Sequence, residues 1–273
     1  MQRHENRRIE KRGMKAAWGQ LARLLALLVL STAALQLYFL LRVALMLVID
    51  PQSTSFQRSE AWRLLRETHQ LSWSQDWVAD EEISPNLKRA VIASEDAGFV
   101  EHAGVEWDAI EKAWDRNQKA EVRAEKVNER IEQREATRKT APAKPPTRAV
   151  PKVVGGSTIS QQLAKNLFLS GERTTLRKAQ EFVITFMLEG LLGKRRILAI
   201  YLNSVEWGEG VFGAEAAARH YFHVDASKLS APAAARLAVM LPAPKRFEKQ
   251  PGSAYVLGRS GTIVARMGAV ELP

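Results

Sequence analysis

Residues Gly155 to Leu169 read GGSTISQQLAKNLFL, a glycine-rich turn that leads into a helix with polar side chains. Glycines let a backbone approach a ligand closely, and hydroxyl and N–H groups at a helix start bind anions. Gln161, Gln162 and Lys165 follow, so one glutamine shares a helix face with the lysine. This face suits a phosphate and sugar hydroxyls, but a capped helix with a solvated polar side would show the same pattern. The lysine does not follow the second glycine, which excludes a Walker loop.

The chain after this stretch is predicted to be helical almost throughout. Apolar residues recur at helical spacing in four segments, Leu176–Leu192, Arg195–Asn203, Ala214–Phe222 and Ser230–Leu241. Upstream, Ser84-Pro85-Asn86 is a helix-start signal. No alternating pattern of useful strand length occurs, so the fold is predicted to be mainly α.

Composition limits the class of protein. The 273 residues suffice for one domain with an anchor, and 46% hydrophobic with 26% charged residues indicates a globular chain. The net charge of +10 suits nucleic acid, anionic lipid or a phosphorylated substrate. Cysteine is absent, which excludes disulfides, thiolate metal sites and a cysteine nucleophile.

The N-terminal segment resembles a membrane anchor. Leu24 to Leu41 carries no charge, and the apolar character resumes after Arg42 and continues to Ile49. The residues before it are mainly basic, so the N-terminus is predicted to be cytoplasmic and the chain after Asp50 to lie outside the cytoplasm. A cleavable signal peptide is the alternative, although the apolar run continues past its small-residue site.

The predicted organisation has five parts. They are a basic cytoplasmic tail (1–20), a transmembrane anchor (21–49), a membrane-proximal segment (50–80), a main folded domain (81–245) and a C-terminal tail (246–273). Trp62, Trp73 and Trp77 in the third part suit either the lipid headgroup level or ordinary packing.

Residues 116–150 form a charged insert within the domain. Arg116 to Thr140 has almost no large apolar residue, and its acidic and basic residues recur every four positions. This pattern predicts a solvated helix or a disordered excursion, followed by an extended linker over Ala141 to Pro151. A nucleic-acid-binding arm is disfavoured on a domain outside the cytoplasm.

Two clusters could carry chemistry. Glu95 follows an apolar helical run, and a carboxylate held partly out of water can act as a general base. Asp96 could orient it or cap the next turn, whereas His102 is interpreted as structural, and the spacing suggests no metal site.

The second cluster is cationic. Arg173, Arg177 and Lys178 lie at a helix start, where the helix dipole does not favour them, so they are expected to face an anion. Glu181 lies one turn further on, where it could instead form an ordinary ion pair.

Four motifs in one order resemble the family 51 peptidoglycan glycosyltransferases. They are the acidic stretch from Glu95 to Gly104, then GGSTISQQLAKNLFL, then RKAQE, then KRRILAIYLN from Lys194 to Asn203. The resemblance covers about residues 80–245 and is closest to membrane-anchored members without a penicillin-binding domain. Ala199 stands where the family often has glutamate, and the 116–150 link is longer than usual.

The resemblance implies a lysozyme-like helical domain that joins lipid II to a growing glycan strand by inverting transfer from an undecaprenyl diphosphate. It assigns Glu95 as the general base and Glu181 as a second carboxylate on the donor side, where a divalent cation such as Mg or Mn could act. It places the substrate at Ser157, Gln161, Gln162, Lys165, Arg173, Arg177 and Lys178.

The same resemblance implies an inner-membrane enzyme of cell-wall synthesis with the catalytic domain in the periplasm. Its expected partners are lipid II, the nascent glycan, the bilayer and cell-wall synthesis or division proteins, without nucleic acid. A glycan-cleaving enzyme would need a proton donor rather than a cation cluster. A catalytically silent lipid II-binding protein would not need Glu95 and Glu181.

Overall fold

The chain forms two compact units, residues 1–49 and 50–273. The computed structural model describes residues 2–136, 147–150, 155–169, 171–172 and 174–273, with side chains from residue 18 onward except that of residue 136.

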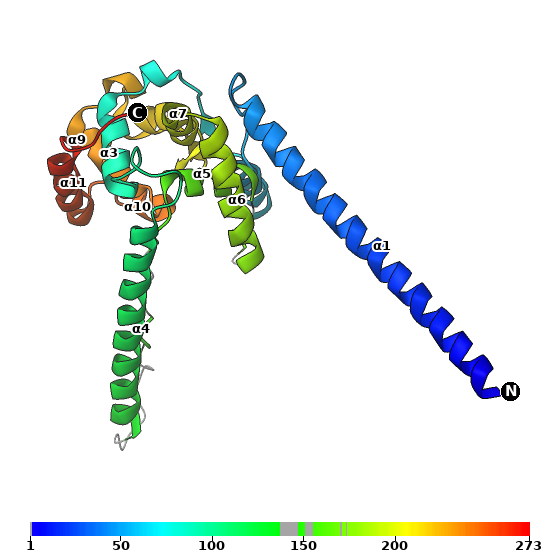
Figure 1. Ribbon diagram of the computed structural model, residues 1–273. Coiled ribbons are helices and arrows are strands. Elements are labelled where there is room, and N and C mark those ends of the chain that lie inside the picture. Colours follow the sequence, from blue (N-terminus) through cyan, green and yellow to red (C-terminus); the bar gives the residue numbers. More distant parts are fainter. Residues whose placement is uncertain (1, 137–146, 151–154, 170, 173) are drawn as a thin grey trace. The chain divides into compact units, whose positions relative to one another are not determined.

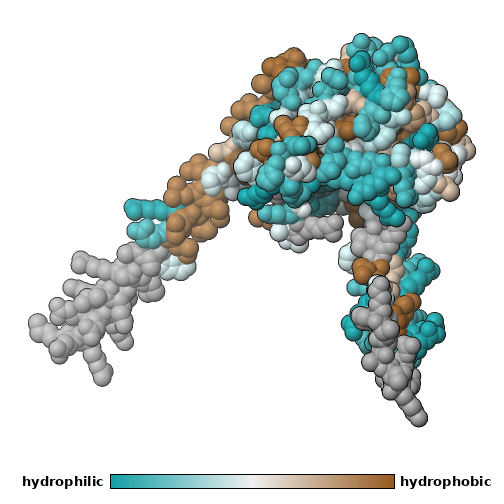
Figure 2. Space-filling model, turned by 180° about the vertical axis from the view of Figure 1, so that it is seen from behind, coloured by the Kyte–Doolittle hydropathy of each residue, from teal (hydrophilic) through white to brown (hydrophobic). Residues whose placement is uncertain are grey.

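The first unit is one long helix, α1 (Gln2–Leu45). Its part from Trp18 to Leu45 is 28 residues long, with a mean hydropathy of 2.2, which is long and apolar enough to cross a membrane. The described side chains of this helix are largely apolar in the space-filling view (Figure 2). The structure therefore confirms an apolar helix where the sequence predicts the anchor.

The second unit is mainly helical, as predicted (Figure 1). Its α-helices are α2 (Ser55–Thr68), α3 (Pro85–Glu95), α4 (Trp107–Ala136), α5 (Ile159–Phe168), α6 (Thr175–Leu191), α7 (Lys194–Ser204), α8 (Ala214–Phe222), α9 (Ala231–Met240), α10 (Pro244–Phe247) and α11 (Ala254–Met267). Two short 3-10 helices, η1 (Asp80–Glu82) and η2 (Ala226–Lys228), complete the helical elements.

Two groups of packed helices position the site. α3, α9 and α11 pack on one another, and α5 packs on α2, α6 and α7. Their cores are made of small and branched side chains, such as Leu87 and Val91 on α3 and Ile159 and Leu163 on α5, all fully buried. Because α3 and α5 each bury one apolar face in a different group, their polar residues can meet between the groups.

A small three-stranded sheet was not predicted. Its order is β1 (Ser74–Gln75), β3 (Val211–Phe212) and β2 (Glu206–Gly208), with β1 parallel and β2 antiparallel to the central strand. Strands of two or three residues are too short to show the alternation that identifies a strand in a sequence.

The predicted outer boundaries of the catalytic domain are corrected. In the region 50–80, α2 packs on α5, and Trp73 stacks on Phe212 with ring centroids 4.5 Å apart. In the region 246–273, α11 buries Val256 and Ile263 against α3 and α9. Both regions are therefore parts of the folded unit and not separate from the predicted domain. Trp62 is 62% exposed, so its two interpretations both remain.

The charged insert is largely a continuation of α4. The helix begins at Trp107, well before the change in composition at Arg116, and runs to Ala136, which supports the solvated-helix interpretation. Asn128 binds the returning chain at both backbone atoms of Ala149 (3.0 and 2.7 Å), so the two legs of the insert lie side by side. Of the expected linker, 147–150 lack regular structure, and 141–146 and 151 lie outside the described residues.

Candidate active site

α3 brings Glu95 to the site. Ser84 accepts a hydrogen bond from the N–H of Asn86 (3.2 Å) and Pro85 occupies the first turn, so the helix begins at the predicted signal. The helix buries Leu87 and ends at Glu95. The carboxylate therefore projects from the end of a packed helix, as the sequence predicts.

Asp96 joins the end of α3 to the start of α5. One carboxylate oxygen accepts a hydrogen bond from the N–H of Ile159 (3.0 Å), and the other lies 2.8 Å from Nε2 of His102. The N–H of Gly104 donates to Nδ1 of the same imidazole (3.0 Å), so a neutral ring carries its proton on Nε2 and donates it to Asp96. His102 thus has the structural role expected of it, whereas the Asp96 side chain ties α5 to His102 and does not have either of the roles expected for it, orienting Glu95 or capping the next turn.

Asp96, His102 and Glu106 could in principle hold a metal ion, because one potential ligand atom of each lies within 4.8 Å of the others. A metal would need the lone pair of Nε2, yet the Gly104 N–H directed at Nδ1 requires the proton to stay on Nε2. The cluster is therefore better described as a chain of hydrogen bonds, and it does not fit a metal centre.

The start of α5 explains the GGST sequence. Thr158 and Gln161 form a capping box, in which each side chain accepts a hydrogen bond from the other residue's backbone N–H (3.2 and 3.1 Å). The Thr158 hydroxyl also donates to the carbonyl of Gly104 (2.6 Å). A Cβ on Gly156 would lie 2.9 Å from the carbonyl oxygen of Ala109. Gly156 is therefore required by packing against α4.

Gln162 connects Glu95 to α7. Its amide nitrogen donates to Oε2 of Glu95 (2.9 Å), and its amide oxygen accepts a hydrogen bond from the hydroxyl of Tyr201 (2.9 Å). Tyr201 is fully buried, and burial, followed by the charges of Glu95 and Asp96, raises its pKa well above the usual value. The hydroxyl therefore stays protonated, and it orients the amide with its N–H groups toward the carboxylate.

Glu95 is held in a state suited to proton transfer. Burial raises its pKa above the usual value, the hydrogen bond from Gln162 opposes that rise, and the charge of Asp96 adds to it. A carboxylate with a raised pKa remains able to ionise near neutral pH and accepts a proton more readily than a fully solvated one.

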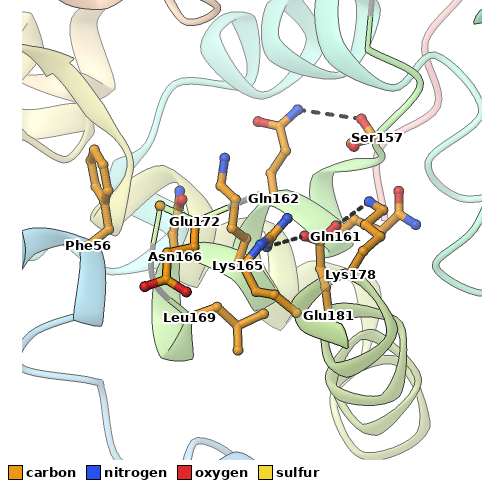
Figure 3. Close-up of a pocket in the computed structure, with 12 residues that line it drawn as sticks. Phe56, Ser157, Gln161, Gln162, Lys165, Asn166, Leu169, Glu172, Lys178 and Glu181 are labelled. Carbon is orange, nitrogen blue, oxygen red and sulfur yellow. Dashed lines mark hydrogen bonds and ion pairs between the residues drawn. The ribbon is translucent and has the colours of Figure 1, made fainter. Parts of the chain in front are cut away.

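Next to the Gln162 amide that donates to Glu95, a cavity of about 310 Å³ lies between α5 and α6 (Figure 3). Lys165 enters it from α5, and Arg177, Lys178 and Glu181 enter it from the first turns of α6. Its remaining lining residues are Phe56, Ser157, Gln161, Gln162, Asn166, Leu169, Gly171 and Glu172. We call this the cationic cavity.

Glu181 is the counterion of two of these cations. Its buried carboxylate lies 2.8 Å from Nη1 of Arg177 and also accepts a hydrogen bond from Nζ of Lys178. Each carboxylate oxygen accepts one of these hydrogen bonds and keeps a second lone pair, so the divalent cation that the family resemblance allows at Glu181 stays a prediction. The amide nitrogen of Gln161 is buried in the same cavity and has no hydrogen-bond partner among the described residues.

A second cavity of about 610 Å³ contains Glu95 and shares three residues with the first, Ser157, Gln162 and Lys165. The structure thus brings together all the site residues that the sequence predicted, except Arg173, which lies outside the described residues. Ala199 lines neither cavity and belongs to a separate one with Arg195 and Arg196.

Sequence reasoning missed four contributors to the site. Tyr201 was noted only as part of a motif, Phe56 comes from α2, and Tyr255 and Arg259 reach the second cavity from α11. The helical spacing of the buried residues of α11 was a signal that could have identified that helix. These residues are the apolar Val256, Ile263 and Met267 and the small Ser260.

A carboxylate that can take a proton lies next to a cavity lined by cations. This arrangement is expected of a transferase in which a base activates the acceptor and cations stabilise an anionic leaving group. The transglycosylase family model matches residues 63–125 and 144–268, more than half of the chain. The chain belongs to this transglycosylase family.

Similar curated proteins match over nearly the whole chain. A biosynthetic peptidoglycan transglycosylase of Paraburkholderia xenovorans is 49% identical over 249 residues, 91% of each chain. One of Cupriavidus metallidurans is 50% identical over 261 residues, 93% of this chain and 98% of its own. The match to the family model is interrupted at 126–143, within the charged insert.

Proposed function

We propose that this protein is a peptidoglycan glycosyltransferase of cell-wall biosynthesis that polymerises lipid II into glycan strands. The family match and the relatives' names support the class of enzyme. One observation supports the mechanism most directly. The second cavity, which contains Glu95, shares Ser157, Gln162 and Lys165 with the cationic cavity. A base and a site for an anionic leaving group are therefore adjacent.

In this mechanism Glu95 takes the proton from the 4-hydroxyl of the acceptor sugar. The freed oxygen attacks the anomeric carbon of the donor from the side opposite the diphosphate, and the bond from that carbon to the diphosphate oxygen breaks. The electron pair leaves with the diphosphate, which needs no proton, because Lys165, Arg177 and Lys178 stabilise its charge. The configuration at the anomeric carbon is therefore inverted.

The remaining polar residues of the site keep these groups in place. Gln162, oriented by Tyr201, keeps the Glu95 carboxylate directed into its cavity. Glu181 holds Arg177 and Lys178 on one side of the cationic cavity before substrate arrives. Gln161, whose buried amide nitrogen has no hydrogen-bond partner among the described residues, lines the donor side, and Ser157 lies where the two cavities meet. Arg173 is proposed from the family resemblance alone.

The N-terminal apolar helix suggests a membrane anchor. We place it in the inner membrane, with the basic N-terminus cytoplasmic and residues 50–273 in the periplasm. Its partners there are lipid II, the nascent glycan and proteins of cell-wall synthesis or division. A reporter fused after Pro273 should be active in the periplasm and one fused before Met1 in the cytoplasm. Cytoplasmic activity of the C-terminal fusion would contradict this orientation.

Incubation of the purified chain with lipid II tests the proposed activity. We expect long glycan strands, with undecaprenyl diphosphate as the second product. Cleavage of preformed glycan, without polymerisation, would identify a glycan-cleaving enzyme instead. Binding of lipid II without any reaction would leave a silent binding protein.

A further inference from the structure

One face of α4 is lined by cations over most of the length of the helix. Successive residues of a helix are rotated by about 100°, so seven exposed cations of α4 fall within an arc of about 80°. They extend along the helix for roughly 33 Å. We call this the cationic face; its residues are Lys112, Arg116, Lys119, Arg123, Lys126, Arg130 and Arg134.

Apart from Asp108 in the first turn, which lies at the edge of the cationic arc, the acidic residues of the same helix lie on the other side. They are also exposed, and they fall outside the arc of the cationic face. We call this the acidic face; its residues are Glu111, Asp115, Glu121, Glu125, Glu129, Glu132 and Glu135.

The stability of the helix alone does not explain why α4 keeps its cations and its acidic residues on separate faces. A solvated helix is stabilised when residues four apart have opposite charge, and like charges at that spacing destabilise it. In α4 most pairs of charged residues at this spacing are alike, for example Lys119 with Arg123 and Glu121 with Glu125. The sequence thus keeps each sign on its own face against the local preference of the helix, which points to an external anionic partner.

The shape and chemistry of the cationic face restrict that partner. The apolar side of α4 is covered by its own returning chain, with Ala113 and Ala124 buried and Asn128 bonded to Ala149. The large apolar side chains that α4 exposes, Trp107, Trp114, Val122 and Val127, lie outside the cationic arc. A protein interface normally has an apolar or aromatic centre, which this face lacks.

We propose that the cationic face of α4 binds the anionic headgroups of a phospholipid bilayer. A lipid surface is extended and flat, so it can contact all the cations at once, while the acidic face points away from it. The apolar helix α1 suggests that the protein is anchored in such a surface. The binding is electrostatic and superficial, because the face has no apolar side chain to insert. This inference does not depend on the assignment of Glu95.

Fluorescent labels on the full-length protein in vesicles test this proposal, and the absence of cysteine allows single-site labelling. Val127 lies beside the cationic face, and Gln118 lies about 120° from the centre of that face, among the acidic residues; both are exposed. Each is replaced by cysteine, labelled and reconstituted with lipids that carry a headgroup-attached quencher. The vesicles are phosphatidylcholine, with or without about one third phosphatidylglycerol.

We expect the label at position 127 to be quenched at least about twofold more in the anionic vesicles, and this excess to disappear in 1 M salt, where the Debye length is about 3 Å. The label at position 118 should show no such excess. Equal quenching at position 127 in both vesicles would overturn the proposal, as would an excess at position 118 equal to that at position 127. An acidic protein as the true partner would give the first of these results.

Two matched variants complete the test. Replacing Lys119, Arg123, Lys126 and Arg130 together by glutamine should abolish the excess quenching. Replacing Glu121, Glu125, Glu129 and Glu132 by glutamine changes as many charges on the opposite face and should preserve it. Circular dichroism checks that both retain the helix. Unchanged quenching in a folded variant without the four cations would contradict the proposal.

Discussion

α5 and α4 are helices of one unit, but different forces maintain them. Seven of the ten residues of α5 are buried, its first turn is fixed by a capping box, and its polar side chains contact Glu95 and the cationic cavity. In the described part of the thirty-residue α4, only Ala113 and Ala124 are buried, and the family match stops partway along it. The comparison teaches that tertiary contacts restrict which residues α5 can have. The sequence of α4 beyond the cavities, in contrast, could change without affecting the reaction.

The largest effect should come from replacing Glu95, the α3 carboxylate that accepts a hydrogen bond from Gln162 of α5. Glu95→Gln keeps the shape of the side chain but cannot take a proton, so glycan formation from lipid II should fall by about 10²- to 10⁴-fold. Donor binding and the thermal midpoint should stay near those of the unaltered protein. Near-normal turnover would remove Glu95 from the role of general base.

A glycine at the junction of the two helices should have the next largest effect. In Gly156→Ala, the new Cβ would lie 2.9 Å from the Ala109 carbonyl oxygen on α4, so the free energy of unfolding should fall by about 1–3 kcal/mol. Gly155→Ala is the matched control, because none of the described residues lies within 4 Å of its added Cβ. Thermal melts of both variants measure the difference, and equal midpoints would show that the junction tolerates the methyl group.

Tyr201→Phe should change the pH dependence of the reaction. Without the hydroxyl, the Gln162 amide can rotate and lose the hydrogen bond that lowers the pKa of Glu95. That pKa should therefore rise further. Activity requires the ionised carboxylate, so the acid limb of the rate profile should move to higher pH, by up to about one unit.

The direction of this shift separates a role in positioning from a general loss of stability. A variant that is only less stable would have a lower rate at every pH, with the midpoint of the acid limb unchanged. The other ionisable groups lining the cavities around Glu95 are the same in both proteins, namely Asp96, Glu106, Arg116, Lys165, Tyr255 and Arg259.

The smallest effect is expected from shortening the arm of α4. Asn128 and Ala149 are hydrogen bonded to each other, so a link of about four glycine and serine residues can replace 129–148 without separating them. The free energy of unfolding should change by less than about 1 kcal/mol, because closure entropy depends weakly on loop length. Activity on lipid II in detergent should persist. A shortened protein that is unfolded or inactive in detergent would show that the arm belongs to the catalytic domain.

Local signals predicted much of the fold. Ser84 and Pro85 marked the start of α3, and apolar spacing located α6 to α9 within one or two residues of their observed ends. The small sheet and α11 were missed because their stability comes from partners distant in sequence. Trp73 packs on Phe212, and Val256 packs in a core formed with α3 and α9. The sequence of each segment alone carries little record of such contacts.

The sequence predicted which residues belong to the candidate site, but not which of them form hydrogen bonds and ion pairs with one another. The motifs named Glu95, Gln162 and the cationic residues, and the structure brings those it describes together. The sequence could not show that Gln162 rather than Gln161 contacts Glu95, because both lie on α5 and only the tertiary fold decides which faces α3. It also could not show that Glu181 binds both Arg177 and Lys178, since spacing alone leaves their rotamers open.

The ion pairs of Glu181 have a consequence for turnover. Arg177, Lys178 and Glu181 together carry a single net positive charge, although Arg177 and Lys178 both face the cavity alongside Lys165. Breaking the glycosidic bond adds one negative charge to the departing diphosphate, so a cavity with a larger excess of positive charge would hold this product most tightly of all its ligands. By offsetting one cation, Glu181 weakens that hold. Its presence should therefore favour release of the spent lipid carrier, and with it the next round of addition to the strand.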